Sequence, residues 1–313
     1  MSSILAGAGS SDLIFLALRH WLSASSRVLI LDPTYGEYAH VLERVIGCTV
    51  DRLTLSAAGG WQVVPAELEA GARHAYDLVV LVNPNSPTGA LLPPPALEVI
   101  IRKAPANTRW WIDETYVDYC APDQSLEPFA ASSHNTVVCK SMSKAYALSG
   151  LRAAYLCGPS RLIGELRHLS PPWSVGLLAQ VAAVAALQDA PYYLARYAET
   201  GRLRAGLAAG LATIHGLSVV PGVANFLLAF LPPEGPAAAE VVRRCSSRGL
   251  FVRDASPMGT CLGDRAIRIA VKDAATNVRI VAILRDAIAE PPGRQPLPSS
   301  GAPLPRQEFL VEG

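Results

Sequence analysis

Residues 77–89 read D-L-V-V-L-V-N-P-N-S-P-T-G, an unbroken apolar run followed at once by a polar segment rich in turn residues. A strand that is apolar at every position, rather than at every second one, is typical of a sheet covered on both faces. The prolines and the glycine that follow end the strand in a turn. This stretch therefore predicts a central strand of a parallel sheet with a polar loop at its carboxyl end, where open α/β sheets bind their ligands.

The same texture recurs on both sides of this strand. Apolar runs of strand length are R-V-L-I-L-D (27–32), W-W-I-D (110–113), T-V-V-C-K (136–140) and A-A-Y-L-C-G (153–158), and helical patterns lie between some of them at 38–46 and 95–103. Alternation of buried strands with helices predicts an α/β fold, a mostly parallel sheet with helices on both faces.

The pattern changes after about residue 160. Residues 161–213 are rich in Ala and Leu and read as helical, and short strands follow at 217–221, 226–231 and 266–271. We expect a large domain over residues 1–185 and a smaller C-terminal α+β domain over residues 186–290. The Pro-rich tail, residues 291–313, has the composition of a disordered segment.

Composition narrows the class of protein. The chain has 313 residues, half of them hydrophobic, and 27 Lys and Arg against 26 Asp and Glu. This balance argues against a protein that coats nucleic acid or an anionic membrane. The six cysteines form no C-x-x-C pair, which favours free thiols over a metal site or a disulfide framework. With no signal-peptide pattern and no apolar run near ~20 residues, a soluble cytoplasmic protein is expected.

Polar residues at the predicted strand ends form a chemically consistent set. Gly7, Gly9, Ser10 and Ser11 open a helical pattern, which offers backbone N–H groups to an anion. Asp113 ends a buried strand, and Lys144 has no Asp or Glu within ten residues on either side. An anion site, a buried carboxylate and an unpaired lysine are what pyridoxal phosphate requires for its phosphate, its pyridine nitrogen and its aldehyde.

Four motifs in order then carry a resemblance. S-M-S-K-A-Y-A-L-S-G-L-R (141–152), N-P-N-S-P-T-G (83–89), D-E-T-Y (113–116) and P-T-Y-G-E-Y (33–38) resemble those of fold type I pyridoxal-phosphate enzymes, and more narrowly the class I/II aminotransferases of the histidinol-phosphate aminotransferase group. The similarity runs from Ile4 to about Leu284. It implies pyridoxal 5'-phosphate as cofactor, amino acids and keto acids as substrates, and a homodimer.

The second half of the chain also resembles another member of that group. P-P-W-S-V-G-L-L-A-Q (171–180), V-P-G-V-A-N-F-L-L (220–228) and A-I-R-I-A-V-K-D-A-A-T-N (266–277) are similar to the threonine-phosphate decarboxylases of cobalamin synthesis. Sequence alone leaves three hypotheses open: an aminotransferase, a decarboxylase, and a catalytically impaired homologue that binds the cofactor.

The resemblance also implies roles in holding the cofactor. Lys144 would form the Schiff base and then carry protons, and Asp113 would pair with the pyridine nitrogen. Tyr35 would stack on the ring and Tyr116 would bind the 3'-oxygen. The phosphate would be held by Arg152 with Ser141, Ser143, Ser10, Ser11 and the backbone near Gly9. Glu114, next to Asp113, should point to the other face of the sheet, because side chains alternate along a strand.

The loop before P-T-G and two arginines of the second half complete the set of candidate site residues. Where the family has Asn directly before P-T-G, this chain has Ser86, with Asn85 one residue earlier; both remain candidates, and the resemblance implies a cis Ser86–Pro87 bond. Arg268 is expected to bind the substrate carboxylate, with Ile267 and Ile269 facing the core. Arg253 is a candidate for a second anion, such as a substrate phosphate.

Family members carry several dozen residues ahead of the glycine segment that opens this sequence. A late-called start codon, a split gene and a shortened protein are all compatible with this difference.

Overall fold

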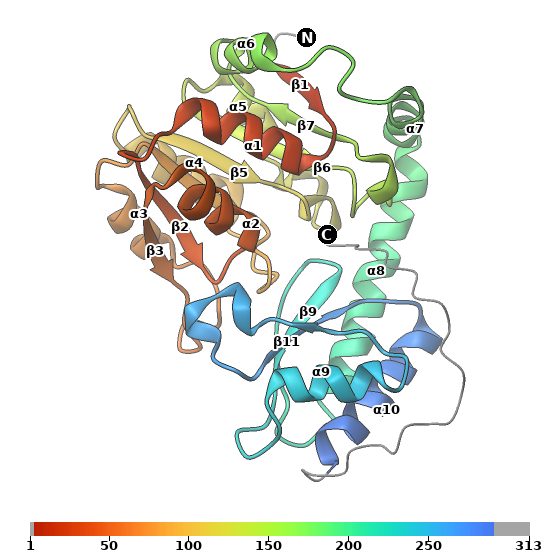
Figure 1. Cartoon of the computed structure of the whole chain (residues 1–313). Coiled ribbons are helices and arrows are strands. Elements are labelled where there is room, and N and C mark those ends of the chain that lie inside the picture. Colours follow the sequence, from red (N-terminus) through yellow and green to blue (C-terminus); the bar gives the residue numbers. More distant parts are fainter. Residues whose placement is uncertain (1–2, 291–313) are drawn as a thin grey trace.

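A central sheet of seven strands forms the larger part of the molecule (Figure 1). The computed structural model describes residues 3–290. The strand order is β1-β7-β6-β5-β4-β2-β3. The strands span β1 (Ile4–Gly7), β2 (Arg27–Asp32), β3 (Thr49–Thr54), β4 (Leu78–Val82), β5 (Arg109–Asp113), β6 (Thr136–Ser141) and β7 (Ala154–Cys157). Neighbours from β3 to β6 pair in parallel, and β7 pairs antiparallel with both β6 and β1.

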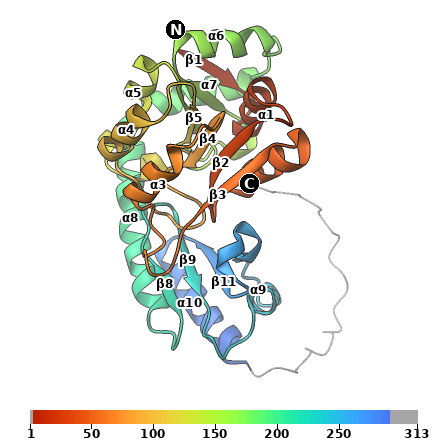
Figure 2. The same cartoon turned by 90° about the vertical axis from the view of Figure 1, so that its left-hand side faces the viewer.

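Both faces of this sheet are buried, as the apolar strands predict. Alternate residues of one strand enter different cores: Val80 and Val82 pack with one set of helices, whereas Val79 and Leu81 pack with another. Figure 2 shows α3 (Pro65–Ala72), α4 (Pro94–Lys103) and α5 (Glu127–Ser132) on one side of the strands and α1 (Ser10–Trp21) on the other. The prediction of a mostly parallel α/β sheet covered on both faces is confirmed.

The remaining α-helices of this part complete the cover or lead away from it. They are α2 (Gly36–Ala39), which continues as a π-helical segment over His40–Ile46, α6 (Ser160–Leu169) and α7 (Leu177–Gln188). The helix α8 (Ala190–Leu211) then runs from the large sheet to the second sheet (Figure 1).

A second sheet of four antiparallel strands has the order β10-β11-β9-β8. Its strands are β8 (Ser218–Val220), β9 (Phe226–Phe230), β10 (Arg253–Asp254) and β11 (Ala266–Ala270). One face packs on α8, α9 (Ala238–Ser246) and α10 (Ala274–Ala289) around a core of its own. The domain limits at residues 185 and 290 stay predictions, and the tail from residue 291 lies outside the described residues.

Three strands are not predicted from the sequence, namely β1, β3 and β10. β1 and β10 are very short, and β3 carries the polar residues Asp51 and Arg52 because it lies at the edge of the sheet. Within residues 3–290, no helix has the length and apolar character needed to cross a membrane. The cysteines are free in the structure, and only Cys120 and Cys261 are partly exposed.

Candidate active site

The carboxyl ends of the parallel strands gather most of the predicted site residues. At the amino end of α1, Gly9 has a φ of +93°, and a Cβ there would lie 2.3 Å from Nη2 of Arg152. Only glycine permits this approach of the guanidinium to the loop. Arg152 donates to the carbonyl of Ser149 at 3.2 Å and has no acidic partner among the described residues. Gly9, the start of α1 and Arg152 thus form a cradle that presents a positive charge next to a helix amino terminus.

The serines predicted for this cradle lie around it. Ser10 and Ser11 begin α1 as expected, and the first amides of a helix lack intrahelical acceptors. The N–H of Gly9 itself donates to the carbonyl of Gly7 at 2.9 Å, so the free amides expected near Gly9 are those at the start of α1. The side chain of Ser141 accepts from the Ser143 amide at 3.3 Å, which leaves the Ser141 hydroxyl hydrogen free to donate. This set of donors fits the phosphate of the expected cofactor.

Lys144 follows β6 in a half-buried position. Across the part of the chain that the structure describes, its amine forms no ion pair and no side-chain hydrogen bond. Burial lowers the pKa of Lys144, and the positive charges of Arg268, Arg152 and Arg253 lower it further, in that order. A raised fraction of neutral amine is what a Schiff-base lysine requires.

Asp113 is buried at the end of β5 and is held from two sides. Its Oδ2 accepts from the Tyr38 hydroxyl at 2.7 Å, and its Oδ1 accepts from the Thr115 amide and hydroxyl at 2.9 and 2.6 Å. Burial raises the pKa of Asp113, and these hydrogen bonds oppose the shift. A carboxylate accepts about four hydrogen bonds, so capacity remains for a ring N–H.

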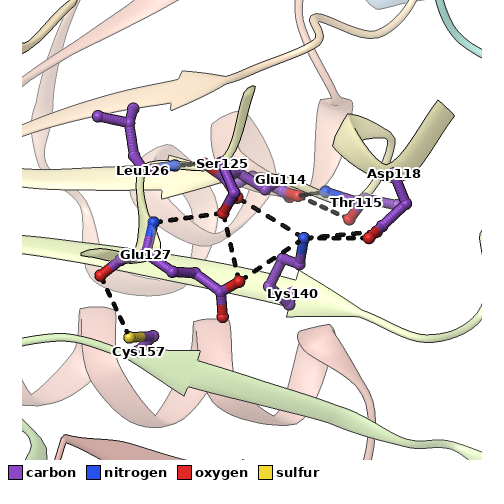
Figure 3. Close-up of polar contacts among 9 residues, drawn as sticks. Glu114, Thr115, Asp118, Ser125, Leu126, Glu127, Lys140 and Cys157 are labelled. Carbon is purple, nitrogen blue, oxygen red and sulfur yellow. Dashed lines mark hydrogen bonds and ion pairs between the residues drawn. The ribbon is translucent and has the colours of Figure 1, made fainter. Parts of the chain in front are cut away.

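Glu114 lies on the opposite face, as alternation predicts. Its carboxylate accepts from the Ser125 hydroxyl and the Leu126 amide, both at 2.6 Å. Figure 3 shows it in a buried polar cluster around Lys140. Glu114 therefore has no part in the Asp113 site.

The two predicted aromatic residues lie near Asp113 and the arginines. Tyr116 is buried, with its ring edge-on to Phe226 at 5.0 Å, and the charges of Arg268 and Asp113 both affect its pKa, which burial raises. Tyr35 is half-buried and donates to Glu37 at 2.7 Å. Burial raises the pKa of Tyr35. Their contacts with a cofactor ring stay predictions.

The loop 83–89 separates its two candidate residues. The Asn85 amide is fully buried and donates to the Pro33 carbonyl and to Thr88, at 3.0 and 3.2 Å, while its oxygen accepts from Thr34. Both N–H groups of Asn85 are thus used within the protein. Ser86 instead accepts from Nη1 of Arg268 at 3.0 Å, and the Ser86–Pro87 bond is cis, as the resemblance implies. Ser86 thus contacts Arg268 whereas Asn85 does not, and the role of either residue in cofactor binding stays a prediction.

Arg268 and Arg253 lie directly opposite each other on β11 and β10. Ile267 and Ile269, beside Arg268, are fully buried in the small core, as expected. The guanidinium of Arg268 lies over the Phe226 ring at 5.0 Å. Like charges in direct register destabilise a sheet unless an anion or a carboxylate lies between them, and among residues 3–290 neither arginine forms an ion pair.

Three residues at the site were missed by sequence reasoning. Tyr38 links Asp113 to Trp111, whose Nε1 donates to the Tyr38 hydroxyl at 2.7 Å. Thr115 holds the other Asp113 oxygen, and Tyr119 donates to the Lys144 carbonyl at 3.1 Å. Tyr38 belongs to P-T-Y-G-E-Y and Thr115 to D-E-T-Y, so the motifs contained this signal.

Comparison with known proteins agrees with this geometry. The model of the family "Aminotransferase class I and II" matches residues 1–287. The chain belongs to this family. The resemblance seen in the sequence motifs is thereby confirmed, and the family is one of pyridoxal-phosphate-dependent enzymes.

Individual relatives of this aminotransferase-family chain bear two kinds of name. A threonine-phosphate decarboxylase of Salmonella typhimurium is 31% identical, over 92% of this chain and 77% of its own length. A histidinol-phosphate aminotransferase of Moorella thermoacetica is 27% identical, over 92% and 72%. Histidinol-phosphate aminotransferase from Sinorhizobium meliloti, solved in complex with pyridoxal-5'-phosphate, shares the fold with a TM-score of 0.78 at 22% identity, over 91% of this chain and 76% of that chain.

Proposed function

We propose that this chain is a pyridoxal-phosphate-dependent aminotransferase that acts on an amino acid or a phosphorylated amino compound. The observation that carries the proposal is the set of cations Lys144, Arg152, Arg253 and Arg268, which have no carboxylate partner among the described residues. Unpaired positive charges around a half-buried amine favour an anionic cofactor and an anionic substrate.

The cofactor, when bound, supplies an aldehyde for the amino group and a ring that withdraws electrons. In this proposal Arg152, Ser141 and the amides of Ser10 and Ser11 bind its phosphate. Asp113 keeps the ring nitrogen protonated, and Tyr38 with Thr115 fixes the orientation of that carboxylate. The hydroxyls of Tyr116 and Ser86 would bind the 3'-oxygen, and Ser86 stands at the position where the family has Asn.

Lys144 has two tasks in this scheme. Its amine would hold the cofactor through the aldehyde, and it would carry a proton to or from the substrate α-carbon. Both tasks require a neutral amine, which burial and the neighbouring arginines promote. Arg268 binds the substrate carboxylate, and Arg253 binds a second anionic group.

The experiment is an absorbance screen of the purified chain, loaded with pyridoxal phosphate, against histidinol phosphate, threonine phosphate and common amino acids. Formation of pyridoxamine phosphate with a donor supports amino transfer. Release of CO₂ from threonine phosphate without pyridoxamine phosphate favours the decarboxylase, as the similarity to the Salmonella protein suggests. A spectrum that no donor changes would leave the chain as a cofactor-binding homologue without catalysis.

We also propose that two copies of the chain associate, because apolar side chains are exposed together before and along α7. Trp173 is 92% exposed, and Leu177, Leu178, Val181 and Val184 are all exposed as well. Exposed apolar residues this close in sequence are typical of a protein interface. Light scattering should give a dimer for the wild type and a monomer for Leu178→Glu, and a monomeric wild type would refute the association.

A further inference from the structure

We propose that Asp32 and Thr260 are positioning residues that hold Arg253 and Arg268 at a fixed place relative to Lys144. They form a latch between the end of β2 in the large sheet and the turn that joins β10 to β11 in the small one. The inference rests on the proposed function, since it concerns the arginines that would bind substrate.

The latch consists of hydrogen bonds between parts of the chain more than 220 residues apart. The Thr260 amide donates to Oδ1 of Asp32 at 2.9 Å, and the Thr260 hydroxyl donates to Oδ2. The thiol of Cys261 donates to the Asp32 carbonyl at 3.4 Å. Hydrogen bonds to a carboxylate are about twice as strong as neutral ones, so these contacts hold the turn firmly.

The partners of Asp32 distinguish it from an ordinary acidic residue. Its exposed fraction is 3%, and Asp is almost never this buried without a charged partner. Yet no Lys, Arg or His pairs with it in the described part of the chain. Gly259 fits closely against it, because a Cβ there would lie 2.5 Å from Oδ1. The site is therefore shaped to receive this turn rather than a cation.

The position of the latch links it to the substrate arginines. The turn connects the two strands on which Arg253 and Arg268 lie opposite each other. On the other side, Asp32 precedes Pro33 and Thr34, which hydrogen-bond to Asn85 in the loop that carries Ser86. Ser86 in turn accepts from Arg268. The latch thus holds the turn between the two arginine strands, and Ser86 holds Arg268 itself.

The decisive variant is Thr260→Val, which removes the hydroxyl donor but keeps the side-chain volume. Its matched control is Thr276→Val, because Thr276 makes the same two kinds of bond, at 2.8 and 2.6 Å, to Asp273 in the cap of α10, outside the latch. Thr260→Ser keeps the hydroxyl and should behave as wild type. We expect Thr260→Val to raise the KM for the accepted phosphorylated donor about tenfold, equal to about 1.4 kcal/mol. The kcat and the absorbance of the bound cofactor should change little.

A second readout needs neither cofactor nor substrate. Cys261 is partly exposed within the latch, and its rate of alkylation, mapped by mass spectrometry, reports opening of the turn. The rate should rise in Thr260→Val alone, with Cys120 as the internal reference. Asp32→Asn is unsuited to this readout: burial and the Asp32 charge raise the pKa of the Cys261 thiol to about 11, so that substitution changes the thiol directly.

The outcomes separate the two proposals. If no donor changes the wild-type spectrum, the proposed function fails, while faster Cys261 alkylation in Thr260→Val still supports the latch. If KM and alkylation in Thr260→Val equal those of the wild type, the latch is refuted. Equal effects of Thr260→Val and Thr276→Val on KM and on unfolding would also refute it, because loss of stability alone would then explain both.

Discussion

Lys140 and Lys144 lie four residues apart on one segment, yet they occupy opposite electrostatic environments. Lys140 lies among carboxylates on the α5 side of the sheet (Figure 3). Its Nζ is 3.4 Å from Asp118, 3.7 Å from Glu114 and 4.0 Å from Glu127. Its pKa is raised, because the carboxylates outweigh a burial that by itself lowers it. Lys144 lies near arginines, and its pKa is lowered by burial first and by these charges second.

The two positions relative to β6 explain why one lysine has a structural role and the other is suited to chemistry. Lys140 is in β6 and points to the face opposite the cradle, whereas Lys144 lies beyond the strand at its carboxyl end. A buried cation among carboxylates stays charged and fixed. An amine beside cations and without a carboxylate is neutral more often and free to react. Variants at the two positions should therefore fail in different ways.

The largest effect on activity is expected for Lys144→Ala. The variant should lose the visible absorbance of lysine-bound cofactor and about 10³-fold in turnover, the order contributed by a positioned proton carrier. Without cofactor, its unfolding in urea should match the wild type, because the Lys144 amine makes no bond within residues 3–290. Retention of the absorbance band would refute the role of Lys144.

Lys140→Met should show the reverse pattern. Removing the cation leaves the fully buried Glu114 and its neighbours uncompensated, and breaking a buried pair of this kind costs about 3–5 kcal/mol in the free energy of unfolding. The loss should be larger at pH 8 than at pH 5, since the stranded carboxylates must ionise at high pH. Urea unfolding at both pH values measures it, and a stability equal to that of the wild type would contradict the comparison.

These two environments differ in how far the sequence predicts them. The absence of acidic residues around Lys144 is a local feature, and it was read correctly as a sign of an unpaired amine. The partners of Lys140 are residues 114, 118 and 127, which come from the segment between β5 and β6 and meet Lys140 only when these two strands pair in the fold. The apolar strands are equally local and are predicted well, whereas the different contacts of Asn85 with Pro33 and of Ser86 with Arg268 depend on segments far away in the sequence.

Glu114→Gln tests the structural cluster around Lys140 through the pH dependence of stability. Burial raises the pKa of Glu114 to about 7, against about 4.3 in an unfolded chain, although Lys140 opposes the shift. Between these values the folded protein keeps a proton that the unfolded chain has lost. The contribution of Glu114 to the free energy of unfolding is therefore greatest below about pH 4 and is lost as pH rises through 7. Relative to wild type, Glu114→Gln should gain up to about 3 kcal/mol between pH 5 and pH 8 in urea unfolding. Parallel curves for the two proteins would refute the raised pKa.

Arg268→Gln tests the environment of Lys144, and its effect is the smallest of those expected, a shift in the pH dependence of cofactor attachment. Arg268 is the charge that lowers the pKa of Lys144 most, after burial, and Arg253 contributes least of the three arginines. Removing the charge of Arg268 should raise the pKa of Lys144, so that the rate of cofactor attachment reaches its plateau at a higher pH. Arg253→Gln should shift the profile in the same direction by less, and Arg268→Lys should keep it near wild type. The measurement is the rate at which visible absorbance develops after mixing with pyridoxal phosphate. A larger shift for Arg253→Gln than for Arg268→Gln would mean that the unbound site orders these charges differently around Lys144.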